Sequence, residues 1–193
     1  MGRSRGFDID DALDAAVRTF WEHGYEASSM QTLCDAMRVQ PGSAYAAFGP
    51  KRALFVAALR RYAETVSADA VRRITTPVSG LQGLRDYFDH LIEAMVDGNR
   101  RWGCLITNSL VEFAERDPEL AGLVGLHLAN LRAAFEAALA RAAAAGELRP
   151  GAGPEAAALL VAVAQGMNVL AKSRPGRAPL RAIVDATLAG LVA

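Results

Sequence analysis

The chain has 193 residues, of which 52% are hydrophobic, so it can bury a substantial core and a disordered chain is excluded. Lys and Arg together number 21, as do Asp and Glu, which excludes a protein that holds nucleic acid by bulk positive charge. The two cysteines are too few for a disulfide framework, and the start MGRSRGFD has no apolar run typical of a signal peptide. We therefore expect a cytoplasmic protein.

Four short helices are predicted over the first 62 residues. Apolar residues recur there at steps of three and four, and Gly, Pro, Ser or Asp separate the repeats. We expect a first helix between the acidic residues 8–14 and Gly24, a second over 30–37, a third over 41–48, and a fourth over 50–62. Tight breaks between such short helices are typical of a helix-turn-helix.

The rest of the chain predicts longer helices. Beyond residue 75 Ala and Leu become more frequent, and Gly and Pro divide the chain into helical segments over 81–97, 104–115, 118–145 and 155–172, then a last helix that follows Pro179 and ends near Val192. No alternation of β-branched and polar residues predicts a strand. The expected fold is all-α with about nine helices.

Two domains are expected, a helix-turn-helix domain of residues 1–50 and a larger helical domain of residues 51–193. The apolar run 156–171 is interrupted by polar residues and is shorter than the roughly 20 residues that span a bilayer. We therefore expect a buried helix and no membrane contact.

The third helix has the composition of a DNA-recognition helix. Such a helix presents small or polar residues to a major groove about 12 Å wide. Ser43 and Tyr45 would donate hydroxyls to phosphates, Gln40 would read a base edge, and Arg3 and Arg5 would enter an adjacent minor groove. The residues expected at DNA are Arg3, Arg5, Ser29, Gln40, Gly42, Ser43, Tyr45 and Lys51.

Each of these assignments has a structural alternative. Tyr45 and Phe48 would serve equally as core residues, Ser29 as a helix cap, and Arg3 and Arg5 as a soluble tail. Over residues 1–62, eight Lys or Arg stand against seven Asp or Glu, so phosphate attraction must come from placement and not from net charge.

The segments FWEHGYEASSM and VQPGSAYAAFGPKRALF resemble the DNA-binding domain of the TetR family of bacterial one-component transcriptional regulators, over about residues 7–62. The resemblance implies a homodimer, a helical C-terminal domain that binds a small molecule, a roughly palindromic operator, and DNA contacts at Ser29, Ser43, Tyr45 and Lys51. Arg38 stands where the family usually has Gly, and a non-Gly residue at positive φ costs about 1 kcal/mol.

Gly42 inside the third helix costs up to about 1 kcal/mol against Ala but lets the helix backbone approach DNA closely. In the C-terminal half, GCLITNSLVEFA is similar to a segment of one TetR subgroup that lines or adjoins the ligand cavity. We expect a largely apolar effector in a mainly apolar pocket. The residues expected around it are Phe88, Ile92, Met95, Trp102, Cys104, Asn108, His127, Leu131 and Met167.

Two roles are open for Cys104. It is expected to begin a helix, whose dipole together with Arg100 and Arg101 would lower the pKa of a thiol, so an electrophile or oxidant sensor is one interpretation and an apolar wall residue the other. Cys34, on the packed face of the second helix, is expected to be inert.

Neither a metal site nor an enzyme is predicted. His90 and His127 have no Cys or carboxylate at ligand spacing, and the sequence has no nucleophile, base or phosphate-loop motif at usable spacing. We expect no cofactor. A ligand-released repressor that dimerises through the last two helices, with DNA affinity altered by movement of the fourth helix, is the favoured interpretation; a non-catalytic helical interaction module is the alternative from another class.

Overall fold

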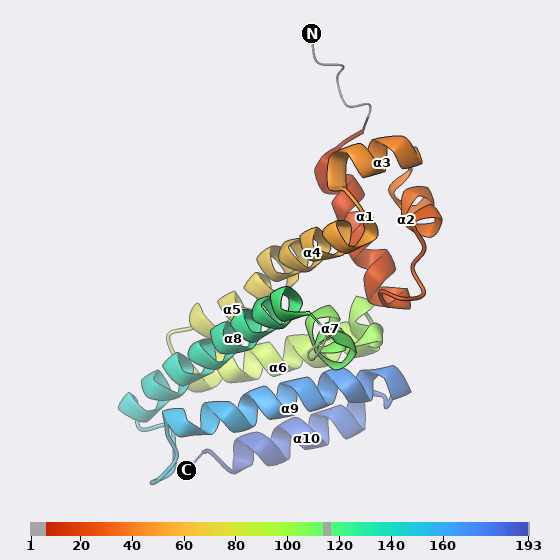
Figure 1. The fold of residues 1–193 in the computed structure, drawn as a ribbon. Helices are drawn as coiled ribbons and strands as arrows, with labels where there is room; N and C mark the ends of the chain where they lie inside the picture. The colour runs from red at the N-terminus through yellow and green to blue at the C-terminus, as the bar shows by residue number, and fades with distance from the viewer. Residues whose placement is uncertain (1–6, 114–116, 193) are drawn as a thin grey trace. The chain divides into compact units, whose positions relative to one another are not determined.

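A computed structural model describes residues 7–113 and 117–192. Its described residues form ten α-helices, α1 to α10, with short 3-10 and π-helical segments between some of them (Figure 1). They contain no named strand; a single isolated antiparallel bridge joins Leu148 and Val192. The all-α prediction is therefore confirmed, and the chain divides into two compact units between Thr65 and Val66.

The N-terminal unit holds α1 (Ile9–His23), α2 (Met30–Met37), α3 (Pro41–Phe48) and α4 (Lys51–Tyr62), at the places that the sequence predicts. Asp8 caps α1 by accepting hydrogen bonds from the backbone N–H groups of Asp10 and Asp11 at 2.8 and 3.0 Å. The aromatic rings of Phe20 and Phe55 meet edge to face with centroids 4.8 Å apart, which joins α1 to α4.

Helix α4 packs within this first unit. The predicted domain boundary follows residue 50, whereas the compact unit extends through Thr65. The reason is burial, because Leu54, Leu59 and Tyr62 of α4 are at most 1% exposed. Tyr62 also meets Trp21 of α1 edge to face, with ring centroids 5.0 Å apart. The fourth helix is thus part of the scaffold behind α2 and α3.

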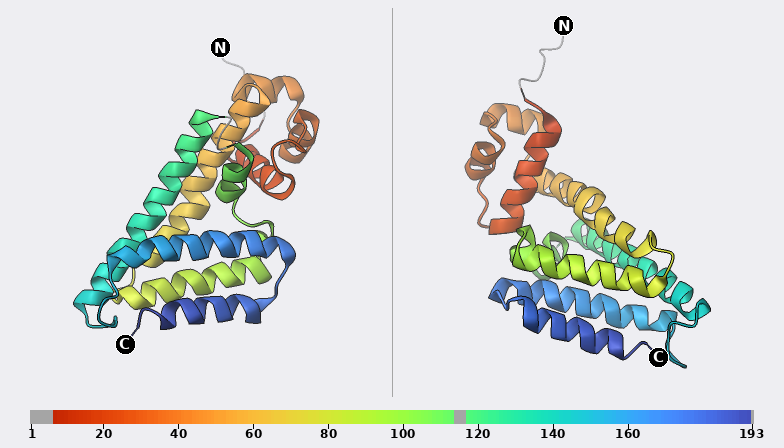
Figure 2. Two further views of the ribbon diagram at one scale, coloured as in Figure 1. Left: turned by 60° about the horizontal axis from the view of Figure 1, so that its bottom comes forward. Right: turned by 180° about the vertical axis from the view of Figure 1, so that it is seen from behind.

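The second unit contains six α-helices: α5 (Ala68–Thr75), α6 (Gly80–Val96), α7 (Leu105–Phe113), α8 (Pro118–Ala144), α9 (Ala157–Leu170) and α10 (Arg177–Ala189). Helices α6, α9 and α10 lie side by side in both views of Figure 2. Phe88 of α6 stacks on Phe135 of α8 with centroids 6.0 Å apart, at the centre of a large hydrophobic core. Gly80 lets α6 approach α8, since a Cβ there would lie 1.9 Å from the Ala138 carbonyl oxygen.

Two features differ from the prediction. No loop follows the fourth helix: α4 ends at Tyr62, and a π-helical segment, Ala63–Ser67, continues it directly into α5. The last helix begins at Arg177, not after Pro179. Pro179 lies in its first turn, where a missing backbone N–H costs no hydrogen bond.

By length and composition, α8 and the helical stretch Pro154–Ser173 are apolar enough to cross a membrane. The second of these is 20 residues long, longer than the run recognised in the sequence. Helices of a soluble core pass the same test, and here Phe135, Leu160 and Met167 are at most 1% exposed in the core of the second unit.

Candidate nucleic-acid interface and effector cavity

Two serines with different roles precede α2. Ser28 is fully buried and its hydroxyl donates to the Gly24 carbonyl at 2.6 Å, which fixes the turn after α1. Ser29 is exposed and caps α2, because its hydroxyl oxygen accepts from the backbone N–H of Thr32 at 3.0 Å. The cap role predicted as an alternative is therefore present, and an exposed Ser29 still has hydrogen-bonding capacity toward a DNA phosphate.

The turn between α2 and α3 depends on a left-handed residue. Arg38 has φ 56° and ψ 40°, and its backbone N–H donates to the Asp35 carbonyl at 3.1 Å. The positive φ expected from the sequence is confirmed. The Arg38 side chain is exposed, and it makes no hydrogen bond or ion pair with the residues that the structure describes.

Helix α3 turns nearly all of its side chains toward solvent. Only Ala44 is buried among its eight residues, and Gln40, Gly42 and Ser43 are exposed. Tyr45 is 50% exposed, so its ring is not the core residue that one interpretation assigned. Phe48 is half-buried, with its ring centroid 6.3 Å from that of Phe7. A short helix that buries only one of its residues and exposes a face of small residues can enter a major groove.

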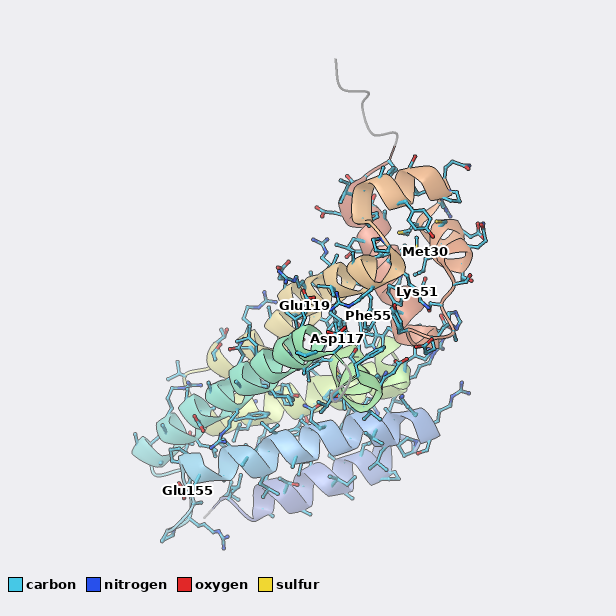
Figure 3. All side chains as sticks on the ribbon, viewed as in Figure 1. Met30, Lys51, Phe55, Asp117, Glu119 and Glu155 are labelled. Carbon is cyan, nitrogen blue, oxygen red and sulfur yellow. The ribbon has the colours of Figure 1, made fainter. Side chains whose placement is uncertain are left out.

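Lys51, the first residue of α4, has an ordered ammonium group. Its Nζ lies 4.2 Å from the centroid of the Tyr25 ring and donates to the Glu26 carbonyl at 3.3 Å. The loop before α2 thus positions a cation that belongs to another helix. Figure 3 labels Lys51 together with Met30, the first residue of α2. Arg3 and Arg5 lie outside the described residues.

A bidentate ion pair joins α1 to α4 within the same unit. The Arg61 guanidinium donates to both carboxylate oxygens of Asp14, at 2.8 and 3.1 Å. These hydrogen bonds hold the pKa of Asp14 below its ordinary value. In α2, burial raises the pKa of the Cys34 thiol, and Asp35 raises it further. A thiol that ionises less readily is a poorer nucleophile, in keeping with the inert role expected for Cys34.

The second unit encloses a small cavity whose walls are part polar and part apolar. Its lining residues are Ser67, Ala70, Tyr87, Cys104, His127, Leu131, Gln165 and Asn168. The enclosed part offers about 10 Å³ to the centre of a water-sized sphere, which is room for about one water molecule. Two buried atoms in this wall, Ser67 Oγ and Asn168 Oδ1, have no hydrogen-bond partner within the described part of the chain.

Three of the nine residues predicted around an effector line this cavity: Cys104, His127 and Leu131. Cys104 is 3% exposed and directly precedes α7, where its carbonyl accepts from the Asn108 N–H at 2.9 Å. The Asn108 side chain donates to the Trp102 carbonyl at 3.0 Å, and neither residue is part of the lining.

The other four predicted residues lie in the hydrophobic core and not in the cavity wall. They are Phe88, Ile92, Met95 and Met167, and each is at most 5% exposed. The physical reason is that the apolar stripe of α6 packs directly against α8, and Met167 of α9 belongs to the same core. His90 lies instead in an open surface groove. Among the described residues, no three His, Cys, Asp or Glu side chains gather where they could hold a metal ion.

The sequence did not indicate Ser67, Ala70 or Tyr87 as binding-site residues. The side-chain amide of Asn168 donates to the Ala164 carbonyl at 2.9 Å, which directs its Oδ1 the other way. Gln165 Oε1 accepts from the Thr107 hydroxyl. Polar residues inside the otherwise apolar α9 were the available signal.

Comparisons with known proteins agree with this geometry. Residues 12–58 match the model of the bacterial regulatory proteins of the tetR family, and residues 80–187 match that of the tetracyclin repressor-like C-terminal domain. The chain is 36% identical over 148 residues to the uncharacterised HTH-type transcriptional regulator YezE of Bacillus subtilis, covering 77% of this chain and 76% of that protein. It is 29% identical to the HTH-type transcriptional repressor ComR of Escherichia coli, covering 97% and 90%.

The fold of this chain is also similar to that of solved structures. A cysteine mutant of the TetR family transcriptional regulator CifR, complexed with 26-bp double-strand operator DNA, superposes with a TM-score of 0.82 at 29% identity, covering 97% of this chain and 98% of that one. The reduced form of Escherichia coli NemR has the same fold, with a TM-score of 0.81 at 18% identity over 95% and 96% of the two chains.

Proposed function

Because this chain belongs to the TetR family of transcriptional regulators, we propose that it is a repressor that binds a roughly palindromic operator as a homodimer and is released by a small-molecule effector. The observation that carries the proposal is the exposed face of α3. Gln40, Gly42, Ser43 and Tyr45 are all exposed on a helix of eight residues, behind which α1 and α4 form a packed scaffold.

Each of these positions has a defined part in the proposed complex. Ser43 and Tyr45 donate hydroxyls to phosphates, and Gln40 reads a base edge. Lys51 contributes a positive charge whose position is set by Tyr25. Ser29 adds a hydroxyl beside the first turn of α2, and the arm with Arg3 and Arg5 supplies minor-groove contacts. Phosphate contacts fix the register, while the α3 face selects the sequence.

Dimerisation through α9 and α10 is supported by small exposed residues at helical spacing. Ala158, Ala162 and Gly166 follow one line of α9, and no atom lies within 4 Å of a Cβ built on Gly166. Leu159 and Val169 on the same helix are 53% and 55% exposed. Such a surface allows helices of two copies to approach closely. Two recognition helices about 34–36 Å apart would then enter successive major grooves.

The effector is proposed to bind at the cavity of the second unit. Ser67, which lines it, is the last residue of the π-helical segment that continues α4. Occupancy of the cavity would act on this segment and so on the helix that carries Lys51. A coupling of about 1–3 kcal/mol would lower operator affinity about 5- to 150-fold.

The test begins with capture of genomic fragments from the source organism by the purified protein, at a stated salt concentration. Affinity for a captured duplex is then measured by fluorescence anisotropy for the wild type, Tyr45→Phe, Lys51→Ala and the control Lys172→Ala, whose side chain is exposed in the second unit. We expect both N-terminal variants to bind about tenfold more weakly with an unchanged oligomeric state. Equal affinities would contradict the DNA contacts assigned to Tyr45 and Lys51, and failure to capture any duplex would favour an interaction module over a DNA reader.

A second candidate function, a thiol-based sensor, is favoured by the place of Cys104 in the wall of the cavity, which His127 also lines. The CifR structures are of cysteine mutants. In this mode the Cys104 sulfur displaces the leaving group of an alkylating electrophile: the carbon–sulfur bond forms as the bond from carbon to the leaving group breaks, the leaving group departs as an anion (iodide from iodoacetamide), and the thiol proton passes to solvent. Alkylation with iodoacetamide should then weaken DNA binding by the wild type and by Cys34→Ser but not by Cys104→Ser. Loss of DNA binding in the alkylated Cys104→Ser protein would contradict a role for this thiol.

A further inference from the structure

The walls of the cavity in the second unit define the chemistry of the group that it takes. Asn168 is 2% exposed and Ser67 is 5% exposed, both residues line the same small space, and one polar side-chain atom of each has no hydrogen-bond partner within the described part of the chain. A buried polar atom without a partner costs free energy that a suitable ligand would recover. The site thus combines two hydrogen-bonding side chains with apolar wall residues.

The two atoms impose different requirements. Asn168 Oδ1 is a carbonyl oxygen and can only accept, while the amide nitrogen of the same side chain donates to the Ala164 carbonyl. The Ser67 hydroxyl both donates and accepts. A group that donates one hydrogen bond and accepts another therefore satisfies both. A carboxylate or an ether has no proton to offer to Asn168.

The charges of the lining residues also restrict the class of ligand. The eight lining residues include neither Asp, Glu, Lys nor Arg, so a charged head group would lose its hydration without gaining a counter-ion. The enclosed space offers about 10 Å³ to the centre of a water-sized sphere, which is enough for one hydroxyl group, and the empty space including the opening is about 280 Å³. Ala70 and Leu131 supply apolar wall for a short carbon chain.

We propose that this cavity binds the hydroxyl group of a small uncharged alcohol, with the hydroxyl donating to Asn168 Oδ1 and accepting from Ser67. This inference rests on the proposed function, since it names the effector class of the same site. It replaces the largely apolar effector expected from the sequence with one that has a single neutral polar head.

The test uses two isomers, butan-1-ol and methyl propyl ether, and the anion butanoate. Binding to the free protein is followed by NMR through the side-chain amide signal of Asn168. We expect saturable binding of butan-1-ol, at least about tenfold weaker binding of the ether, and no binding of butanoate. Ser67→Ala should weaken alcohol binding about tenfold, whereas the control Ser109→Ala, whose hydroxyl donates to the Leu105 carbonyl, should not.

Ether binding as tight as alcohol binding, or no saturable binding of either, would overturn the inference and leave the cavity as the site of a structural water molecule. Fluorescence anisotropy with a captured duplex distinguishes a failure of the alcohol site from a failure of the proposed DNA binding and release. If butan-1-ol saturates the cavity without changing DNA affinity, the alcohol site stands and the release mechanism fails. If the protein binds no duplex, the operator proposal fails and the alcohol site is still decided by NMR.

A different observation carries a second inference, on Arg38. Residues in the left-handed conformation are usually Gly, Asn or Asp, because a larger side chain is strained there. Strain of this kind persists where a function requires the side chain. Arg38 holds such a conformation at the turn before α3, and its exposed guanidinium has no partner within the described part of the chain. We propose that Arg38 contacts a DNA phosphate.

The chain provides a matched control in Arg174, the other non-Gly residue at positive φ among those described, which lies exposed in the second unit. Both Arg38→Gly and Arg174→Gly should raise the melting temperature by about 2–4 °C. Only Arg38→Gly should weaken binding to a captured duplex, about tenfold, and flatten the slope of log K against log salt by about 0.9 for each protomer bound. An unchanged slope and affinity in Arg38→Gly, with wild-type binding intact, would overturn the assignment.

Discussion

Gly42→Ala separates the stability of α3 from its function. Gly42 is exposed inside a helix, has no positive φ, and would place a Cβ within 4 Å of no other atom. The added methyl group therefore brings neither a clash nor a packing contact in the free protein. What remains is the backbone entropy of glycine, about 0.5–1 kcal/mol, so the variant should be more stable by about that amount.

Gly42→Ala should raise the stability of the protein but lower its affinity for operator DNA. A methyl group on the groove-facing side of α3 would keep the helix backbone from its closest approach to DNA, and we expect affinity to fall at least about fivefold, close to 1 kcal/mol. Urea unfolding gives the stability, and fluorescence anisotropy with a captured duplex gives the affinity.

The matched control is Gly122→Ala in α8, where a Cβ also meets nothing within 4 Å. It should raise stability similarly and leave DNA affinity unchanged. If Gly42→Ala binds DNA as tightly as Gly122→Ala does, the close approach of α3 to the groove is refuted.

Three further changes test the scaffold. Gly80→Ala should destabilise the second unit by about 1–3 kcal/mol or more in urea unfolding, because its Cβ would collide with the Ala138 carbonyl oxygen. Ser29→Ala should cost about 1 kcal/mol through loss of the α2 cap, and a restored stability in Ser29→Asp would confirm that origin. Asp14→Asn should lower stability more at pH 7 than at pH 3. The hydrogen bonds from Arg61 lower the folded-state pKa of Asp14, so their contribution is fully present above the ordinary pKa and is lost as the pH falls through the folded-state pKa. An equal loss at both pH values would contradict it.

The N-terminal elements were predictable because their signals are local. Ser29 caps α2, Pro41 begins α3 and Gly49 ends it, and each signal acts within a few residues of its helix end. Tyr45 was harder to place, because helical spacing gives the side of a helix on which a residue lies but not whether a neighbour covers that side. Its half-exposed ring depends on how thin the packing behind α3 is.

The cavity depends on contacts between distant parts of the chain and was only partly predictable. Ser67 and Asn168 are about a hundred residues apart in sequence, and neither stands in a motif. The apolar stripe of α6 correctly indicates that Phe88 and Ile92 are buried, but it does not distinguish a core from a pocket wall. The π-helical turn that brings Ser67 to the cavity has no recognised sequence pattern here.

The contacts that hold the Lys51 ammonium against Tyr25 and Glu26 affect the entropy of DNA binding. A free lysine side chain loses up to about 2 kcal/mol of rotamer entropy when it is fixed. Because Tyr25 and Glu26 already hold the ammonium in the folded protein, most of that loss occurs during folding and not when DNA arrives. Calorimetry should therefore find a less unfavourable binding entropy for the wild type than for a Tyr25→Leu variant, in which Lys51 is still charged but samples many rotamers.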